Sequence, residues 1–315
     1  SFLHLATARF MIGIGEAGGN PPSHSLISDY FRKEERGFAF GIYQLGVPVG
    51  TLLAFLVGGW LVSSVGWRMT FVAFGLPGFV LAILIWATVR EPERGAADNL
   101  VETRQSKMGW IAQVKILLNV RILRTMMISG GLNSLAAHAL TMWLIDFFVR
   151  IHNYSAHSAS IMLAFAVGLG GAAGTLTGGY VSDRLSRLGA IRPFDTPAWA
   201  LIMGGPVIFM ACFAPPAVAT GLIFVTFFLL YATFGPMYGL VQTLAPVRSR
   251  ALAMAIYSLS LSLIGAGCGP LLMGIISDAL RHSYGEAEAL RMALSIASIL
   301  PLIAGLLLLR RRTEV

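Results

Sequence analysis

Nine stretches of about 20 apolar residues constrain this chain more than any other feature of its sequence. A stretch of that length spans the hydrocarbon core of a bilayer as a helix, because lipid offers the backbone no other hydrogen-bond partners. With 56% hydrophobic and only 12% charged residues, the composition lies far from that of soluble domains. We therefore expect an all-α integral membrane protein. Its nine predicted transmembrane helices lie at roughly 1–30, 37–63, 69–89, 122–148, 158–182, 196–214, 217–244, 250–279 and 291–309.

The cations of the connecting segments predict the orientation. On this helix map, 18 of the 23 Lys and Arg residues fall on one side of the membrane and 4 on the other, and Arg9 lies within it. Cytoplasmic loops carry the excess of Lys and Arg. We expect a multi-pass protein of the inner (plasma) membrane with a cytoplasmic C-terminus, and the net charge of +8 requires no nucleic-acid partner.

An internal repeat predicts the domain organisation. Residues 36–45 align with residues 250–259 at an offset of 214, with Arg, Ala, Ile, Tyr and Leu identical. Parallel repeats of six helices are one plan of secondary transporters. The repeat implies twelve helices in two six-helix halves, three of them before Ser1. The predicted domains are 1–89 (helices 4–6), a polar cytoplasmic linker at 90–121, and 122–315 (helices 7–12).

Arg9 and Glu16 are charges inside the first apolar stretch. Seven residues apart, they lie on nearly the same face of a helix. Charges at that depth are costly and usually handle ions or substrate. Burial favours a neutral carboxyl, whereas a nearby guanidinium favours the carboxylate. A movable Arg9–Glu16 contact would let proton and substrate exclude each other; the alternative is a static ion pair between helices.

Several motifs together resemble the major facilitator superfamily, and within it the Spinster-like branch. They are Arg9–Ala17, Pro21–Phe31 with basic residues 32–36, Trp143–His152, the Gly-Gly-Tyr-Val-Ser-Asp-Arg-Leu run at 178–185, Gly235-Pro236 with Gln242, and Gly267–Pro270 with Ser277-Asp278. The resemblance implies proton coupling and polar-substrate recognition at Arg9 and Glu16, and lysophospholipid or sphingolipid-like substrates. The acidic and basic partners that the family has in its first helix would precede Ser1.

Other candidate site residues lie in the second half. By the resemblance, Asp183 and Arg184 end a helix where the family has its cytoplasmic gate; an ordinary solvated loop is the alternative. Five polar or amphipathic residues of apolar helices could line a central cavity or hydrogen-bond between helices: Asn133, His138, Tyr231, Tyr238 and Gln242.

The chain lacks the motifs of enzymes and pumps. It has no P-loop or nucleophile motif, and its cysteines, Cys212 and Cys268, have no metal-ligand spacing. We expect no enzyme activity, metal or cofactor. The best reading is a monomeric secondary transporter working by alternating access, proton-coupled and carrying an amphiphile. A proton-coupled transporter of small organic anions is the first alternative, and a membrane-embedded sensor or channel is the alternative of another class.

Overall fold

The computed structural model describes residues 2–92, 109–190, 192–246 and 249–311, and within them every regular element is a helix. We call residues 2–92 the N-terminal region and residues 109–311 the C-terminal region. The helices of the N-terminal region are α1 (Phe2–Tyr30), η1 (Lys33–Glu35), α2 (Arg36–Gln44), α3 (Gly46–Leu53), η2 (Ala54–Gly58) and α4 (Gly59–Thr88).

The C-terminal region contains more helical segments than the N-terminal region. Its helices are α5 (Trp110–Asn119), α6 (Arg121–His152), α7 (Ala156–Phe165), η4 (Ala166–Gly170), α8 (Gly171–Arg187), α9 (Asp195–Phe213), α10 (Pro216–Tyr231), α11 (Phe234–Leu244), α12 (Arg250–Ser260), η6 (Leu261–Gly267), α13 (Gly269–Ala297) and α14 (Ile299–Arg311). The π-helical pieces η2, η4 and η6 continue the rods α3, α7 and α12 without a loop. Such bulges bend a helix locally.

Seven helical segments of the described residues are long and apolar enough to cross a membrane. They are Lys33–Val62, Ser64–Thr88, Arg121–His152, Ala156–Arg187, Asp195–Phe213, Pro216–Leu244 and Arg250–Arg310. The last has 61 residues and contains Gly285, whose φ of 77° is not helical. Gly66, with φ 78°, interrupts α4 in the same way. The membrane helices are confirmed as a class, whereas the count of nine stays a prediction.

Part of the predicted linker is a helix. The segment at 90–121 was expected to be a polar loop, but α5 occupies its last third. Ile111, Val114 and Leu117 recur every three residues and so lie on one side of α5, and Leu117 is fully buried. The apolar positions of this segment are few and lie beside charged residues, so the sequence alone does not predict the helix.

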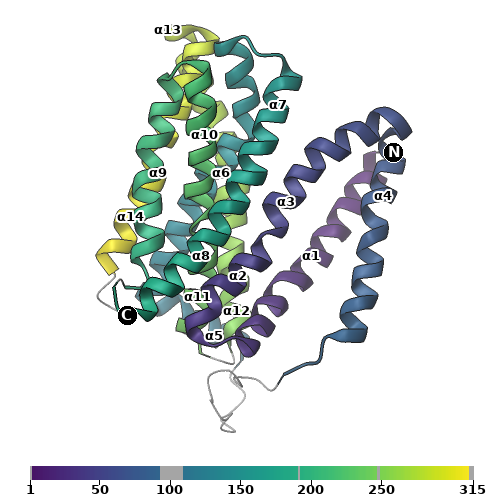
Figure 1. Ribbon diagram of the computed structural model, residues 1–315, viewed down its shortest axis with the longest axis vertical. Coiled ribbons are helices and arrows are strands. Elements are labelled where there is room, and N and C mark those ends of the chain that lie inside the picture. The colour runs from purple at the N-terminus through teal and green to yellow at the C-terminus, as the bar shows by residue number, and fades with distance from the viewer. Residues whose placement is uncertain (1, 93–108, 191, 247–248, 312–315) are drawn as a thin grey trace.

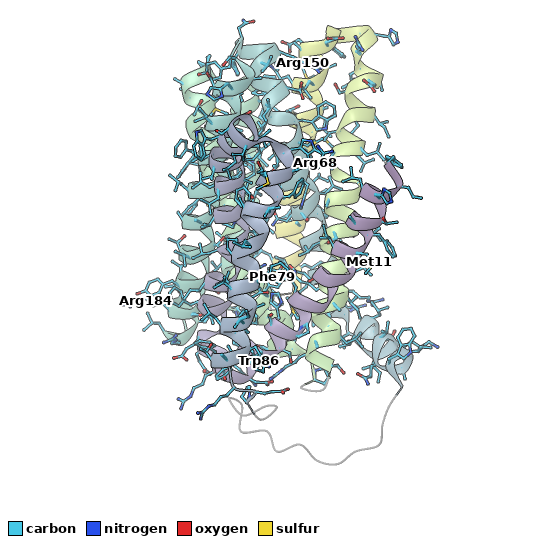
Figure 2. The ribbon with its side chains drawn as sticks, turned by 90° about the vertical axis from the view of Figure 1, so that its right-hand side faces the viewer. Met11, Arg68, Phe79, Trp86, Arg150 and Arg184 are labelled. Atoms are coloured by element: carbon cyan, nitrogen blue, oxygen red, sulfur yellow. The ribbon has the colours of Figure 1, made fainter. Side chains whose placement is uncertain are left out.

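The two regions meet at one end of the molecule and also further along, where α3 packs against η4. Figure 1 shows α2, α5, α11 and α12 together at the lower end, where α1 also ends, while the upper part of α1 and α4 leans away from the bundle of the C-terminal region. We call this lower end the linker end, because α5, the described helix of the linker, lies there. Figure 2 places Arg184 towards the linker end and Arg68 and Arg150 towards the opposite end. Their separation agrees with the predicted sorting of the cations.

Glycines set how closely the helices of the C-terminal region approach. A Cβ at Gly174 would overlap the carbonyl oxygen of Phe228, and one at Gly178 would overlap that of Ala232. The backbones of α8 and α10 are therefore in direct contact. The Gly174-x-x-x-Gly178 pattern of α8 thus acts as a helix-packing motif.

Candidate functional site

The structure describes the helix that carries the predicted coupling residues, but not their side chains. Arg9 and Glu16 both belong to α1, so their helical register is as predicted. Their side chains lie outside the described residues. The Arg9–Glu16 contact stays a prediction.

Asp183 joins the two regions at the linker end. It stands in the last turns of α8, and its Oδ2 accepts a hydrogen bond of 2.7 Å from the backbone N–H of Phe38, in the first turn of α2. Backbone N–H groups at a helix start are unsatisfied by the helix and favour negative charge. A Cβ at Gly37 would overlap Asp183 Oδ1, so only glycine allows this approach. Asp183 therefore caps a helix of the other region.

Arg187 adds a second bond across the same boundary, but Arg184 does not. The Nε and Nη2 atoms of Arg187 donate to the carbonyl oxygen of Glu34, at 3.1 and 2.9 Å. Arg184 is exposed on the outer side of α8, where its Nη1 donates to the hydroxyl of Tyr180 at 2.9 Å. Of the predicted gating pair, Asp183 makes a contact between the regions and Arg184 contacts its own helix.

Two buried arginines form a second contact between the regions. Arg36 Nη2 donates to the carbonyl oxygen of Ser28 at 2.6 Å, and its Nη1 lies 3.4 Å from Thr243 Oγ1. Arg250 Nε donates to the carbonyl oxygen of Gln242 at 3.1 Å, and its Nη1 lies 3.4 Å from Asp29 Oδ1. Each guanidinium thus binds a carbonyl of its own region and a side chain of the other.

The 214-residue repeat relates every member of this contact. The offset that pairs Arg36 with Arg250 also pairs Ser28 with Gln242, and Asp29 with Thr243. We call these six residues the arginine brace. Its bonds follow one two-fold pattern, with a carboxylate as the cross-region acceptor on one side and a hydroxyl on the other. The structure thereby supports the internal repeat on grounds independent of sequence identity.

Aromatic rings extend the same symmetry. His24 stacks on Tyr238 with 4.8 Å between ring centroids, and the offset of 214 pairs these two residues. Each also meets a tyrosine of its own region edge-on: Tyr43 lies 4.9 Å from His24, and Tyr257 lies 5.4 Å from Tyr238. Tyr43 and Tyr257 are again repeat partners. Stacked rings and the arginine brace together close the linker end.

The sequence alone does not predict the arginine brace. The predicted helix map places Arg36 and Arg250 among the cations of the cytoplasmic side, which stays a prediction. The structure makes them the first residues of α2 and α12, where they are 0% and 2% exposed rather than part of a solvated loop. A buried guanidinium persists only where hydrogen bonds replace its water. The identity of the arginines in the repeat was visible, but their acceptors come from other helices. Only the fold shows the contact.

The candidate cavity residues make contacts between helices. Asn133 Nδ2 on α6 donates to the carbonyl oxygen of Leu230 at 3.2 Å and to Thr233 Oγ1 at 3.1 Å. Tyr231 is buried against Phe234, with ring centroids 4.6 Å apart, and Tyr238 belongs to the aromatic cluster.

The remaining two candidates differ in exposure. Gln242 is fully buried, and its carbonyl serves the brace. His138 is exposed, and its Nδ1 contacts the carbonyl oxygen of Ser134. Cavity lining stays a prediction for all five residues.

This arrangement suits a contact that forms and breaks rather than covalent chemistry. It joins the regions through hydrogen bonds, one buried ion pair and ring stacking, and these groups regain water when they separate. Desolvation offsets most of the Coulomb gain of a buried ion pair. The closed and open states of such a contact can therefore lie close in free energy.

The sequence matches the Major Facilitator Superfamily profile over residues 1–263. Among relatives, an "MFS-type efflux pump" of Mycolicibacterium smegmatis is 25% identical over 97% of the chain and 70% of its own length. The "Sphingosine-1-phosphate transporter SPNS2" of Danio rerio is 26% identical over 90% of the chain and 59% of its own length. The "Probable L-galactonate transporter" of Escherichia coli (strain K12) is 27% identical over 90% of the chain and 65% of its own length. The chain thus spans 59–70% of these relatives.

A solved structure of a Spinster homologue is also similar to this chain. A bacterial homologue of the human lysosomal transporter Spinster, in an inward-facing and unoccupied conformation, aligns with 99% of the chain and 78% of its own chain. The TM-score is 0.70 and the sequence identity is 25%.

Proposed function

The chain belongs to the major facilitator superfamily, in its Spinster-like branch, and on that premise we propose that it moves an amphiphile across the membrane by alternating access, coupled to protons. The chain is a transporter protein of this family and not an enzyme. Substrate, coupling and mechanism in the whole protein belong to the proposal.

The arginine brace is the observation that carries the mechanism. Alternating access needs a contact between two units that closes one end of the path and opens again. Repeat-related residues of the two regions meet at the linker end, through Arg36 with Thr243 and Arg250 with Asp29. The hydrogen bond from the Phe38 N–H, at the start of α2, to Asp183 adds a third contact between the regions. Holding this contact is the role in gating that we propose for Asp183. We propose that these contacts release when the linker end opens.

Coupling is assigned to Arg9 and Glu16. Both lie on α1, the helix whose last turn carries Ser28 and Asp29 of the brace. A proton on Glu16 would free Arg9 for an anionic head group, and loss of that proton would restore the pair. One rigid helix then connects the coupling site with the linker-end contact.

Two substrate classes remain, and the relatives divide between them. The sphingosine-1-phosphate transporter SPNS2 favours a lipid with a charged head, whereas the L-galactonate relative favours a small organic anion. The amphiphile is preferred because the chain belongs to the Spinster-like branch, among whose members is the sphingosine-1-phosphate transporter SPNS2. The small organic anion is the second candidate.

The proposed arrangement in the membrane also rests on membership of the major facilitator superfamily. We place the linker end in the cytoplasm together with the C-terminus, in the plasma membrane, because the cations gather on that side. Residues 1–89 and 122–315 then belong to two six-helix halves joined by the linker at 90–121, and the protein acts as a monomer.

Uptake into proteoliposomes tests the proposal. The full chain is reconstituted with an imposed pH gradient and assayed with a lysophospholipid and with a short sugar acid in parallel vesicles. We expect proton-driven movement of the lysophospholipid, and its loss in Glu16→Gln. Glu91→Gln, an exposed carboxyl at the end of the N-terminal region, is the matched control and should behave as the parent.

Each contrary result has a defined meaning. Proton-dependent uptake of the sugar acid alone would replace the amphiphile with the small organic anion. Transport with unchanged pH dependence in Glu16→Gln would reduce the Arg9–Glu16 contact to a static pair.

A further inference from the structure

A cavity of about 680 Å³ lies on the side of the molecule between α2 and α8, beside the Asp183 contact. It is lined by Phe31, Glu35, Phe38, Ala39, Ile42, Tyr180, Asp183, Arg184, Arg187 and Leu188. Its walls come from both regions. The cavity lies beside the first turns of α2 and the last turns of α8.

One wall is apolar and uncovered. The side chains of Phe38, Ile42 and Tyr180 are 39–51% exposed, although they border on helices that are otherwise closely packed. Phe38 and Tyr180 meet edge-on across the boundary between the regions, with 6.2 Å between ring centroids. This wall offers an acyl chain an apolar surface at the depth where these spans end.

The other wall carries two guanidinium groups. Arg184 donates to a tyrosine hydroxyl and Arg187 to a backbone carbonyl, so these hydrogen bonds leave both positive charges without neutralisation. Asp183 lies near Arg187, but its carboxylate is directed to the N–H groups of α2. Glu35 is the other carboxyl of the lining, and it is exposed.

The wider rim is positive. Arg32, Lys33 and Arg192 are exposed at the same end of the molecule. Together with Arg184 and Arg187 they outnumber the carboxylates of the same described segments, which are Glu34, Glu35, Asp183 and Asp195. Guanidinium groups are well suited to phosphate, which they bind through two parallel hydrogen bonds.

We infer that this cavity binds an anionic phospholipid of the leaflet at the linker end. The phosphate lies against Arg184 and Arg187, and one acyl chain runs along Phe38 and Ile42. The size fits, since ligand sites of this volume hold a head group and the upper part of a chain. The inference rests on the membrane placement proposed above and not on the transported substrate.

A bound lipid would act on the linker-end contact. The same molecule touches α2 of the N-terminal region and α8 of the C-terminal region, on either side of the Asp183 bond. It therefore stabilises the closed linker end and leaves when the helices separate. An anionic leaflet would favour the closed state.

Native mass spectrometry of the detergent-purified full chain tests the site, with phosphatidylglycerol as the probe. Phosphatidylcholine and free glycerol phosphate serve as comparison ligands. Arg184→Gln is the principal variant, because Arg184 makes no bond across the regions among those found in the described residues. Arg184→Lys restores the charge. Arg192→Gln is the matched control, because it removes an exposed cation of the same end that does not line the cavity.

Retention of phosphatidylglycerol should fall roughly fivefold in Arg184→Gln, from the loss of one cation near a lipid surface. It should fall less in Arg184→Lys than in Arg184→Gln, because the ammonium keeps the charge but not the two parallel hydrogen bonds, and it should stay near the parent value in Arg192→Gln. An equal fall in Arg192→Gln would show diffuse attraction and overturn the site. Displacement of the lipid by glycerol phosphate would convert it into a site for soluble anions, and retention of phosphatidylcholine at the same level would overturn the requirement for an anionic head.

A second variant separates the site from effects on folding. Ile42→Trp fills the apolar wall and leaves both arginines in place, so the retained lipid should decrease without a change in charge. Ile83→Trp, on the exposed surface of α4, is its control. Equal retention in both tryptophan variants would contradict the proposed acyl contact. Retention needs no transport, so failure of the substrate proposal would leave these results unchanged.

Discussion

The N-terminal and C-terminal regions are equally apolar in sequence but differ in packing. In the first two spans, Lys33–Val62 and Ser64–Thr88, 6% of the most apolar window is buried, against 44–56% in the five later spans. Mean hydropathy in those first windows, 2.0 and 2.1, lies within the range of the others. Hydropathy therefore identifies which helices enter a membrane but does not tell which of their faces meet protein.

Glycine contacts follow the same division within the described residues. In the C-terminal region, Gly174, Gly178 and Gly205 lie against backbone atoms of neighbouring helices. In the N-terminal region, Gly50 and Gly75 have open space where a Cβ would be, and large side chains such as Phe79 and Trp86 are exposed along α4 (Figure 2). Contact between the regions is concentrated at the linker end, where Gly37 meets Asp183 and α11.

The largest expected effect comes from closing the approach of α8 and α10. Gly178→Leu places a side chain where a methyl group already overlaps the backbone of Ala232, and helix backbones cannot move aside cheaply. We expect a loss of about 4 kcal/mol or failure to fold. In the 315-residue chain, Gly50→Leu should change stability by less than about 1 kcal/mol, because a Cβ there meets no described atom within 4 Å. Thermal unfolding in detergent compares the two, and equal losses would remove the distinction between the regions.

The arginine brace comes next, and its two sides should differ. Arg250→Gln takes the guanidinium away from the buried carboxylate of Asp29, which we expect to destabilise the linker-end contact by about 3 kcal/mol. Arg36→Gln loses a neutral acceptor, Thr243, together with a carbonyl, and should cost about half as much. Chemical unfolding of both variants gives the ratio. A larger loss for Arg36→Gln would contradict the assignment of Asp29 as the stronger acceptor.

Asp183→Asn is expected to have a smaller effect. The amide oxygen can still accept the hydrogen bond from Phe38, but the negative charge at the start of α2 is lost. We expect a cost of about 1 kcal/mol and a greater population with the linker end open. Hydrogen exchange of the Phe38 backbone amide measures this opening directly, and we expect the amide to exchange faster in the variant. Unchanged protection would mean that Asp183 holds no part of the contact.

The smallest effect is expected at the opposite end of the C-terminal region. Arg150 pairs with Asp146 one turn away on α6 at 3.2 Å, and both side chains are substantially exposed. Arg150→Ala should change stability by about 0.5 kcal/mol or less. A loss comparable to that of Arg250→Gln would contradict the view that ion pairs matter here only where the regions meet.

The sequence predicted the membrane helices, the family and the repeat, because apolar length, loop charge and paired motifs are local signals. The family resemblance singles out Asp183 through a contiguous Gly-Gly motif, and the structure places it at the contact between the regions, while its gating role stays a prediction. The brace was not predicted, because Arg36 and Arg250 find their acceptors on other helices and are preceded by polar residues that indicate a loop. The helix α5 was missed for a similar reason: its apolar side is short and lies beside a charged segment.

Motion of the linker end tests the central claim most directly. Spin labels at Lys33→Cys and Ser186→Cys, one in each region beside the brace, are introduced after Cys212→Ala and Cys268→Ser. The distance between them is measured across pH and with lysophospholipid. Alternating access predicts a short and a long population whose ratio changes with proton and substrate, and a fixed ratio in Glu16→Gln. One unchanging distance under every condition would contradict the account.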